Sequence, residues 1–406
     1  MIIFIKTNRL LQGVFMNQTV QAEPVAEQSR DSKHVYYFDY LRLIAAFCVV
    51  YMHVAASPLR NPITLGWQLN NAVVSFSFCA VPLFFMMSGY LILSSRKTSD
   101  VGILLKKRMP HLLVPLAFWT VTYAVFDNYL AGTLSFSSIK DVLINSVSNP
   151  AEVHLWYMYT LIAIYAVSPI LFGGVKSLDG KGRKYIFVLI SAVTVLSMVN
   201  ILLSAFSLRT VRIDLFSKLM IFGGDLVIFV LGYFLGSTKI RIPNFCLIIF
   251  TVAVFSAITV GTHFVSASAN EYSQLFQSQH EGFEVALAAG IFLLFKQNFN
   301  KPSRILKAVP IVPLTMSIYF SHLVFIYLAY RLGITNTGFR TTIIMVLCVF
   351  IISYLFSKTA ATIKPLCFLI TGLRYKEACE TCNWIYTYIN IKKLISGRKN
   401  RSSDNA

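Results

Sequence analysis

Ten long apolar stretches constrain the fold of this chain more than any other feature. A membrane-spanning helix needs about 20 consecutive apolar residues, because the hydrocarbon core of a bilayer is about 30 Å thick. Of all residues, 56% are hydrophobic and 13% are charged, whereas about 25% are charged in a soluble globular chain. The sequence therefore predicts an all-α integral membrane protein, a polytopic bundle of about ten transmembrane helices. The candidate spans are residues 36–56, 72–94, 112–131, 153–173, 185–207, 218–236, 243–264, 282–296, 308–330 and 341–363. The eighth is short, so it either starts earlier, among Glu281 and Glu284, or is re-entrant.

The distribution of basic residues predicts the orientation. Lys and Arg in short loops are retained on the cytoplasmic side, and most of the 36 Lys and Arg residues fall in the loops and tails on the side of the amino terminus. Both termini are therefore predicted to be cytoplasmic. Contact with the anionic lipids of the inner leaflet explains the net charge of +19. Nucleic-acid binding is not expected, because the chain has no soluble basic domain.

Three segments differ in composition. Residues 1–35 form a polar cytoplasmic lead-in without the apolar core of a secretory signal, and Met16 is an alternative start that would leave residues 1–15 untranslated. Residues 36–363 contain the ten spans. Residues 364–406 form a basic cytoplasmic tail, in which WIYTYINIKKLI predicts a helix lying on the inner membrane surface. Its CxxC pair, Cys379 and Cys382, lacks a second ligand pair, so no metal site is predicted.

Two polar residues of the first span, Arg42 and His53, share one helix face. Eleven residues at about 100° each return to within about 20° of the starting direction and rise about 16.5 Å. A charge near the bilayer core costs at least about 2.5–3.5 kcal/mol, so such residues usually line a cavity and serve function. His53 is the best candidate for a general base, because imidazole accepts and returns protons near neutral pH. The alternative is a histidine that only packs between helices.

A second polar group is predicted near the inner surface. Arg42 lies one helical turn from Asp39, and Lys107 and Arg108 belong to a basic loop on the same side. Guanidinium groups bind phosphate through paired hydrogen bonds, so this rim suits a phosphate-rich cytoplasmic donor; the alternative is the ordinary excess of positive charge in inner loops. The second span adds Ser88 and Gly89, a hydroxyl and a site of close backbone approach, although small residues there commonly serve helix packing.

Aromatic and imidazole side chains gather in the outer half. His154, Trp156 and Tyr157 begin the fourth span. An aromatic belt at the membrane surface explains the tryptophan and tyrosine but not the histidine, and sugar rings commonly stack on such aromatic faces. Tyr319 and His322 lie in the ninth span, where His322 is a second acid or base or a group that orients His53.

The order of these segments resembles the acyltransferase 3 family of bacterial inner-membrane proteins over roughly residues 36–363, with the greatest likeness to O-acetyltransferases of surface polysaccharides such as enterobacterial common antigen. The most specific match is the Arg, ten residues, His spacing of Arg42 and His53 after Asp39. The other matches are Phe84, Phe85, Ser88 and Gly89; His154, Leu155, Trp156, Tyr165 and Pro169; and Tyr319 and His322. Where many members have Arg, two residues, Arg, this chain reads Arg108, Met109, Pro110, His111, so Arg108 carries over with Lys107 beside it and the second arginine is absent.

This resemblance implies a multi-pass enzyme of the bacterial inner membrane that moves an acyl group, most often acetyl, from acyl-CoA to a hydroxyl of a surface polysaccharide or its lipid-linked precursor. Acetyl-CoA is then a co-substrate and no bound cofactor is expected. The catalytic residues would be His53 and Arg42. The donor-binding residues would be Asp39, Ser88, Gly89, Lys107 and Arg108, and those binding or supporting the acceptor would be His154, Trp156, Tyr157, Tyr319 and His322. The alternatives are an O-succinyltransferase of the same family, or an exporter of polysaccharide or acyl groups.

Overall fold

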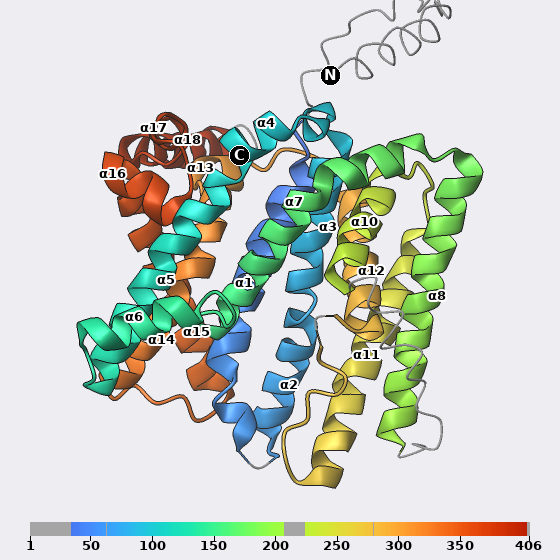
Figure 1. The fold of residues 1–406 in the computed structure, drawn as a ribbon, viewed down its shortest axis with the longest axis horizontal. Coiled ribbons are helices and arrows are strands. Elements are labelled where there is room, and N and C mark those ends of the chain that lie inside the picture. Colours follow the sequence, from blue (N-terminus) through green and yellow to red (C-terminus); the bar gives the residue numbers. More distant parts are fainter. Residues whose placement is uncertain (1–33, 62, 207–223, 279, 404–406) are drawn as a thin grey trace, which may run out of the picture. The chain divides into compact units, whose positions relative to one another are not determined.

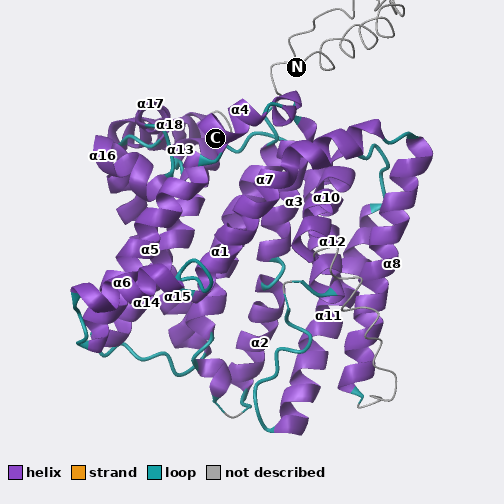
Figure 2. Cartoon of the chain, viewed as in Figure 1, coloured by secondary structure: helices purple, strands orange, loops and turns teal. Residues whose placement is uncertain are grey.

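The computed structural model describes residues 34–61, 63–206, 224–278 and 280–403, with side chains through Ser396. Every regular element in these ranges is a helix (Figure 1, Figure 2). The expected lead-in lies almost entirely outside the described residues, as do residues 218–223 of the sixth expected span. The helices are α1 (Tyr36–Ala55), α2 (Leu65–Ser77), α3 (Ala80–Ser94), α4 (Val101–Ile103), α5 (Pro110–Ala131), α6 (Phe136–Asn145), α7 (Trp156–Ser177), α8 (Gly180–Ala205), α10 (Gly224–Ser237), α11 (Asn244–Ala269), α12 (Gly282–Asn298), α13 (Arg304–Ala308), α14 (Thr315–Arg331), α15 (Phe339–Thr362), α16 (Lys364–Leu366), α17 (Tyr375–Thr381) and α18 (Trp384–Ser403).

The predicted polytopic helical membrane fold is confirmed. Among the described residues, eight helical stretches are long and apolar enough to cross a bilayer, and the other two expected spans correspond to the shorter helices α10 and α12. The eighth expected span begins at Gly282, so its helix does not start earlier, and residues 270–278 and 280–281 before it are not helical. The eight stretches are Tyr36–Ala55, Leu65–Ser94, Val101–Ala131, Val153–Ser177, Gly180–Ala205, Asn244–Ala269, Val312–Arg331 and Phe339–Thr362.

Side chains at the helix ends explain where several helices begin and end. The Asp179 carboxylate accepts a hydrogen bond from the Gly182 amide at the start of α8, at 2.7 Å, and the Thr64 hydroxyl accepts one from the Trp67 amide at the start of α2. Such bonds satisfy amide groups that have no partner within the helix. Gly132 ends α5 in the left-handed conformation, with φ of 71°, which glycine adopts without steric cost.

Helix α1 lies inside the bundle and carries the predicted polar face. It packs against α2, α3, α14 and α15, and Leu41, Ala45 and Val54 are fully buried in these contacts. Arg42 and His53 on the same helix are only half-buried. Both side chains therefore keep accessible surface although the helix that carries them is surrounded by others.

Helices α3 and α10 cross at very close range. A Cβ atom on Gly89 would lie 1.7 Å from the carbonyl oxygen of Phe229, and one on Gly232 would lie 2.1 Å from that of Met86. Only glycine permits this approach of two backbones. The crossing holds α10 against the helix that carries Ser88.

The C-terminal segment packs on the membrane helices, and the described residues from Tyr36 onward belong to one compact unit. The His111 ring donates from Nδ1 to the Gly372 carbonyl oxygen at 2.5 Å. Lys358 of α15 is fully buried; its Nζ donates to the Thr387 hydroxyl at 2.6 Å and lies 4.2 Å from the centre of the Trp384 ring. This cation–π contact attaches α18 to the end of α15.

Candidate functional site

Three histidine rings from distant parts of the sequence form an imidazole cluster. His53 comes from α1, His154 from the turn Val153–Leu155 that precedes α7, and His322 from α14. The ring centres of His53 and His322 are 4.9 Å apart, those of His154 and His322 are 5.2 Å apart, and those of His53 and His154 are 6.1 Å apart. Three of the predicted residues therefore meet in one place.

Backbone hydrogen bonds fix the ring nitrogens of two of these histidines. Nδ1 of His53 donates to the Val49 carbonyl oxygen at 2.8 Å, and Nδ1 of His322 donates to the Tyr319 carbonyl oxygen at 2.6 Å. In a neutral imidazole the other nitrogen then carries the lone pair. Nε2 of His53, on a half-buried side chain, is thus in the state that a general base requires.

Several polar atoms at the imidazole cluster are buried without a hydrogen-bond partner among the described residues. They are both ring nitrogens of His154 and Nε2 of His322. The hydroxyl groups of Ser317 and Ser321, on the same helix as His322, are also buried without such a partner. Buried polar groups in native proteins are nearly always paired with protein atoms, water or a ligand. The unpaired atoms therefore mark a place where a polar ligand or water would bind.

Tyrosine side chains hold the backbone around the cluster. Tyr319 donates its hydroxyl hydrogen bond to the His154 carbonyl oxygen, which ties α14 to the start of α7. The Tyr123 hydroxyl donates to the Phe320 carbonyl oxygen at 2.6 Å, and its ring centre lies 5.3 Å from that of His154. The sequence analysis missed Tyr123, because only the packing of α5 against α14 brings it to the cluster.

Glu152 is a second residue that the sequence analysis missed. Its carboxylate accepts from the Tyr327 hydroxyl at 2.9 Å and from the Val153 amide at 3.1 Å. Burial raises the pKa of Glu152, and these two hydrogen bonds oppose that rise. Its position two residues before His154 was the available signal.

Arg42 lies in a separate polar cluster nearer the start of α1. It interacts electrostatically with the Asp39 carboxylate and with the phenol groups of Tyr157 and Tyr165. The Ser88 hydroxyl interacts with the same two phenol groups. The structure thus brings together Arg42, Asp39 and Ser88, which were all predicted near the inner surface. Tyr157, predicted in the outer half among the acceptor residues, lies beside them instead. We name these four with Tyr165 the arginine cluster.

The basic loop contributes one ordered and one exposed side chain. Arg108 donates to the Thr98 hydroxyl at 2.7 Å and to the Ser95 hydroxyl at 3.2 Å, and it interacts electrostatically with Tyr165. Lys107 is exposed. Gly89 has a packing role at the crossing with α10, and its predicted contact with the donor stays a prediction.

The two clusters are connected through Tyr157. Its ring centre lies 5.8 Å from that of Tyr319, which in turn contacts the rings of His154 and His322. One row of contacting side chains therefore joins the arginine cluster to the imidazole cluster. Along α1 the two clusters are separated by the rise from Arg42 to His53, about 16.5 Å.

Trp156 points to different neighbours. Its ring contacts are with Tyr157, at 6.3 Å between ring centres, and with His280, at 5.1 Å. Nδ1 of His280 donates to the Asp225 carboxylate at 2.8 Å, and this bond raises the pKa of His280. The Trp156 ring thus faces His280, which joins the start of α10 to the residues just before α12.

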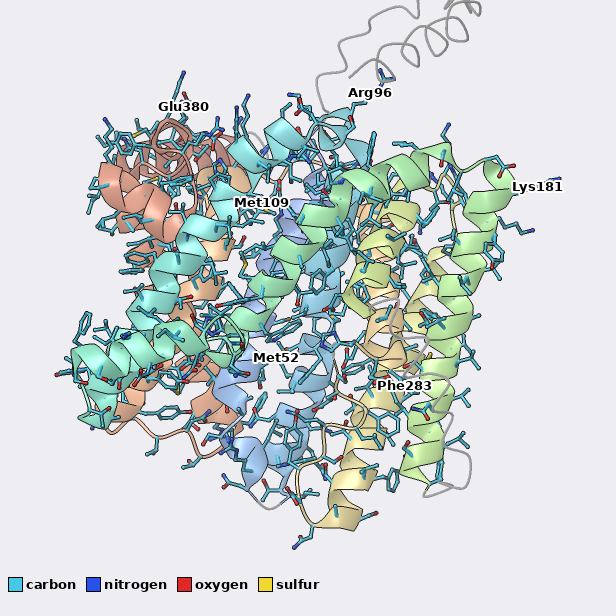
Figure 3. All side chains as sticks on the ribbon, in the orientation of Figure 1. Met52, Arg96, Met109, Lys181, Phe283 and Glu380 are labelled. Carbon is cyan, nitrogen blue, oxygen red and sulfur yellow. The ribbon has the colours of Figure 1, made fainter. Side chains whose placement is uncertain are left out.

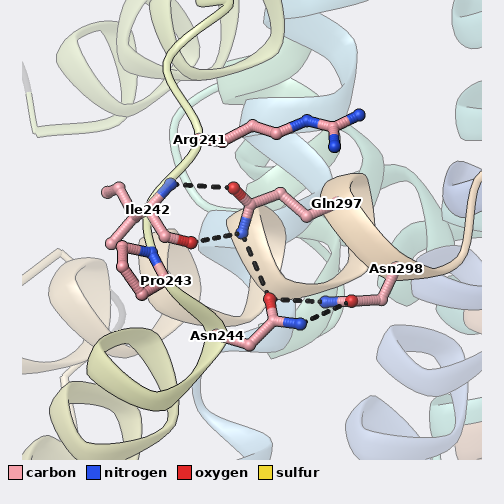
Figure 4. A pocket seen from close by; sticks show the side chains of 6 residues that line it. All are labelled: Arg241, Ile242, Pro243, Asn244, Gln297 and Asn298. Atoms are coloured by element: carbon pink, nitrogen blue, oxygen red, sulfur yellow. Dashed lines mark hydrogen bonds between the residues drawn. The ribbon is translucent and has the colours of Figure 1, made fainter.

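A pocket of about 370 Å³ lies elsewhere, between the loop after α10 and the end of α12 (Figure 4). Gln297 bonds the backbone of Ile242 in both directions, and Asn244 pairs with Asn298. These mutual bonds engage the amide side chains of the pocket, which contains none of the predicted site residues. Across the described ranges, no group of three or more His, Cys, Asp or Glu side chains has the arrangement of a metal site.

Comparison with known proteins identifies one family. The family model described as an acyltransferase domain matches residues 35–358, a range that contains every residue of both clusters. No curated protein and no solved structure gives a significant match.

Proposed function

We propose, because the chain belongs to the acyltransferase 3 family, that this membrane acyltransferase moves an acetyl group from cytoplasmic acetyl-CoA to a hydroxyl of a surface polysaccharide or its lipid-linked precursor in the bacterial inner membrane. The proposed class of acceptor is a polysaccharide such as enterobacterial common antigen. The observation that carries the proposal is the meeting of His53, His154 and His322, with unpaired nitrogens, in a chain of this family.

The arginine cluster supports a donor site. Arg42 and Arg108 both interact with Tyr165, and paired guanidinium groups suit the diphosphate of acetyl-CoA. The exposed Lys107 adds charge at the rim. An extended pantetheine arm is about 20 Å long, like five or six residues of extended chain. A donor whose phosphates bind near Arg42 would therefore place its thioester near His53.

The imidazole cluster supports the transfer step. His53 takes the proton of the acceptor hydroxyl through Nε2 as the oxygen attacks the thioester carbonyl. The tetrahedral oxyanion then collapses, the carbon–sulfur bond breaks, and the CoA thiolate recovers the proton from His53. A hydrogen-bond donor at His154 stabilises the oxyanion. Transient acetylation of His53 is the alternative route.

The test uses the full chain in lipid nanodiscs with radiolabelled acetyl-CoA. We expect His53→Ala to lower acetyl transfer and acetyl-CoA turnover at least about 10²-fold, with the exposed His34→Ala as the matched control. Parallel assays with succinyl-CoA decide the acyl group. Full activity of His53→Ala would refute the mechanism, and absence of any acyl-CoA turnover in the wild type would favour an exporter.

A further inference from the structure

The Asp225–His280 pair is a polar feature that the proposed mechanism does not use. The two side chains are hydrogen-bonded at 2.8 Å, yet 44% of the His280 side chain and 15% of the Asp225 side chain are exposed. They join the first turn of α10 to the residues just before α12. The pair is thus neither buried nor part of the imidazole or arginine cluster.

Two independent measures place this pair deep in the membrane domain. Lys296 donates to the carbonyl oxygens at the end of α10, and Asn300 accepts from the first amide of α1, so α10 ends near the level where α1 begins. From Ser237 to Asp225, α10 rises about 18 Å. In Figure 3, Phe283 of α12 lies at a height similar to Met52, beside His53, and far from Arg96 and Glu380.

An exposed Asp–His pair at this depth requires water or a polar ligand. Ionisable side chains facing hydrocarbon are costly and face a protein interior or a water-filled cavity instead. The neighbouring residues 270–278 are also non-helical and run beside α11 and α2 (Figure 2). Non-helical backbone at membrane depth occurs where it is buried in protein or lines such a cavity.

The neighbours of the pair suit a sugar. Trp156 offers an aromatic ring 5.1 Å from that of His280, and carboxylate and imidazole groups exchange hydrogen bonds with hydroxyls. From Trp156, ring contacts lead through Tyr157 and Tyr319 to the imidazole cluster. Asp225 also interacts electrostatically with Tyr157.

We propose that Asp225, His280 and Trp156 form a water-filled side portal that binds a saccharide acceptor on its way to the imidazole cluster. The identification of a saccharide as the molecule bound in the portal rests on the proposed function. The access of water to the portal does not depend on that function and can be tested separately.

The first experiment measures access with a membrane-impermeant methanethiosulfonate reagent, and mass spectrometry locates the label. In His280→Cys we expect the introduced thiol to react at least about tenfold faster than Cys348, because only a thiol in contact with water forms the reactive thiolate. Cys348 is exposed on the apolar helix α15 and is the internal control. Ser278→Cys, which keeps the Asp225–His280 pair, serves if His280→Cys fails to fold. Equal, slow labelling of the introduced thiol and Cys348 would overturn the portal.

The second experiment tests the occupant. Purified Ser278→Cys protein, which keeps the Asp225–His280 pair, carries a bulky maleimide on the introduced thiol and is given acetyl-CoA and a panel of N-acetylglucosamine, galactose and lactose. We expect acetyl transfer to sugar to be lost and acetyl-CoA hydrolysis to persist. Equal loss of both reactions, unchanged transfer, or no transfer to any sugar by an unmodified protein that hydrolyses acetyl-CoA would each overturn the saccharide portal. Absence of hydrolysis and transfer in the unmodified protein would instead refute the proposed function, and the labelling result would still decide the access of water.

Discussion

Replacing Gly89 by alanine tests how strictly the α3–α10 crossing positions the arginine cluster. The new Cβ atom would lie 1.7 Å from the Phe229 carbonyl oxygen and 2.6 Å from its carbon, whereas real Cβ contacts essentially never fall below 3.0 Å. The obstacle is backbone, so no side chain can rotate away. The two helices must therefore separate by about 1.3 Å, because packed protein interiors do not compress.

The expected consequences follow from that separation. Overpacking of this kind costs about 1–3 kcal/mol, so the unfolding temperature of purified Gly89→Ala protein should fall. Ser88, the adjacent residue, moves with α3 and changes its position relative to Tyr157 and Tyr165. A displacement of about 1 Å in a site can lower the rate about 10²-fold, and we expect at least a tenfold loss of acetyl-CoA turnover.

Two further variants make this reasoning falsifiable. Gly174→Ala, in α7, adds a methyl group with no described atom within 4 Å, and it should retain stability and activity. Gly232→Ala disturbs the same crossing from α10, where the Cβ atom would lie 2.1 Å from the Met86 carbonyl oxygen. Its combination with Gly89→Ala should be less costly than the sum of the single changes, because the helices part only once. Wild-type stability and turnover in Gly89→Ala would refute the argument.

Three other outcomes are expected. Arg108→Ala should raise the KM for acetyl-CoA about tenfold, because a charge-assisted contact with the donor is lost. Lys107→Ala should change this KM less than about threefold, because salt at physiological concentration screens an exposed charge. The reverse order in steady-state kinetics would contradict the placing of the donor phosphates at Arg108. Asp225 raises the pKa of His280, so the pair stabilises the folded protein below the unfolded pKa of about 6.5, and this stabilisation is lost as the pH rises through the higher folded pKa. The difference in unfolding temperature between wild type and Asp225→Asn should therefore shrink from pH 6 to pH 8. A difference that grows over this range would exclude the pair as its cause. Lys358→Met should speed tryptic cleavage within α18, because the ammonium contact that attaches this helix is lost, and unchanged cleavage would show that other contacts hold it.

Hydropathy predicted the membrane helices because each span consists of one continuous stretch of apolar residues. The alignment of Arg42 with His53 was predictable for the same reason, since both lie on one helix. The sequence did not predict that α2 begins at Leu65, seven residues before the expected span, or that α6 and α13 form. Polar capping residues and tertiary packing, rather than apolar runs, set these boundaries.

The site was less predictable, because its residues come from separate helices. His154 and His322 were singled out by residue type in apolar surroundings, but their meeting with His53 depends on how α1, α7 and α14 pack. Tyr123 was missed because a tyrosine in a membrane helix is ordinary until a neighbour is known. Trp156 was grouped with the histidines from its sequence position, whereas its ring lies against His280.

The hydrogen bonds of the imidazole cluster assign different tasks to the three rings. With Nδ1 of His53 and of His322 each donating to a backbone carbonyl, the neutral rings offer only acceptor nitrogens to a substrate. Neither ring can then stabilise an oxyanion before it gains a proton. Neither nitrogen of His154 makes a well-formed hydrogen bond to a described residue, so of the three rings His154 is the one that is free to present an N–H while remaining neutral. In the proposed mechanism the proton of the acceptor hydroxyl would therefore go to His53 or His322, and the developing negative charge would face His154. Since His53 is half-buried and His322 is fully buried, His53 is the more accessible of the two to an incoming hydroxyl, which supports His53 as the base in the proposed mechanism and leaves His322 to orient the acceptor.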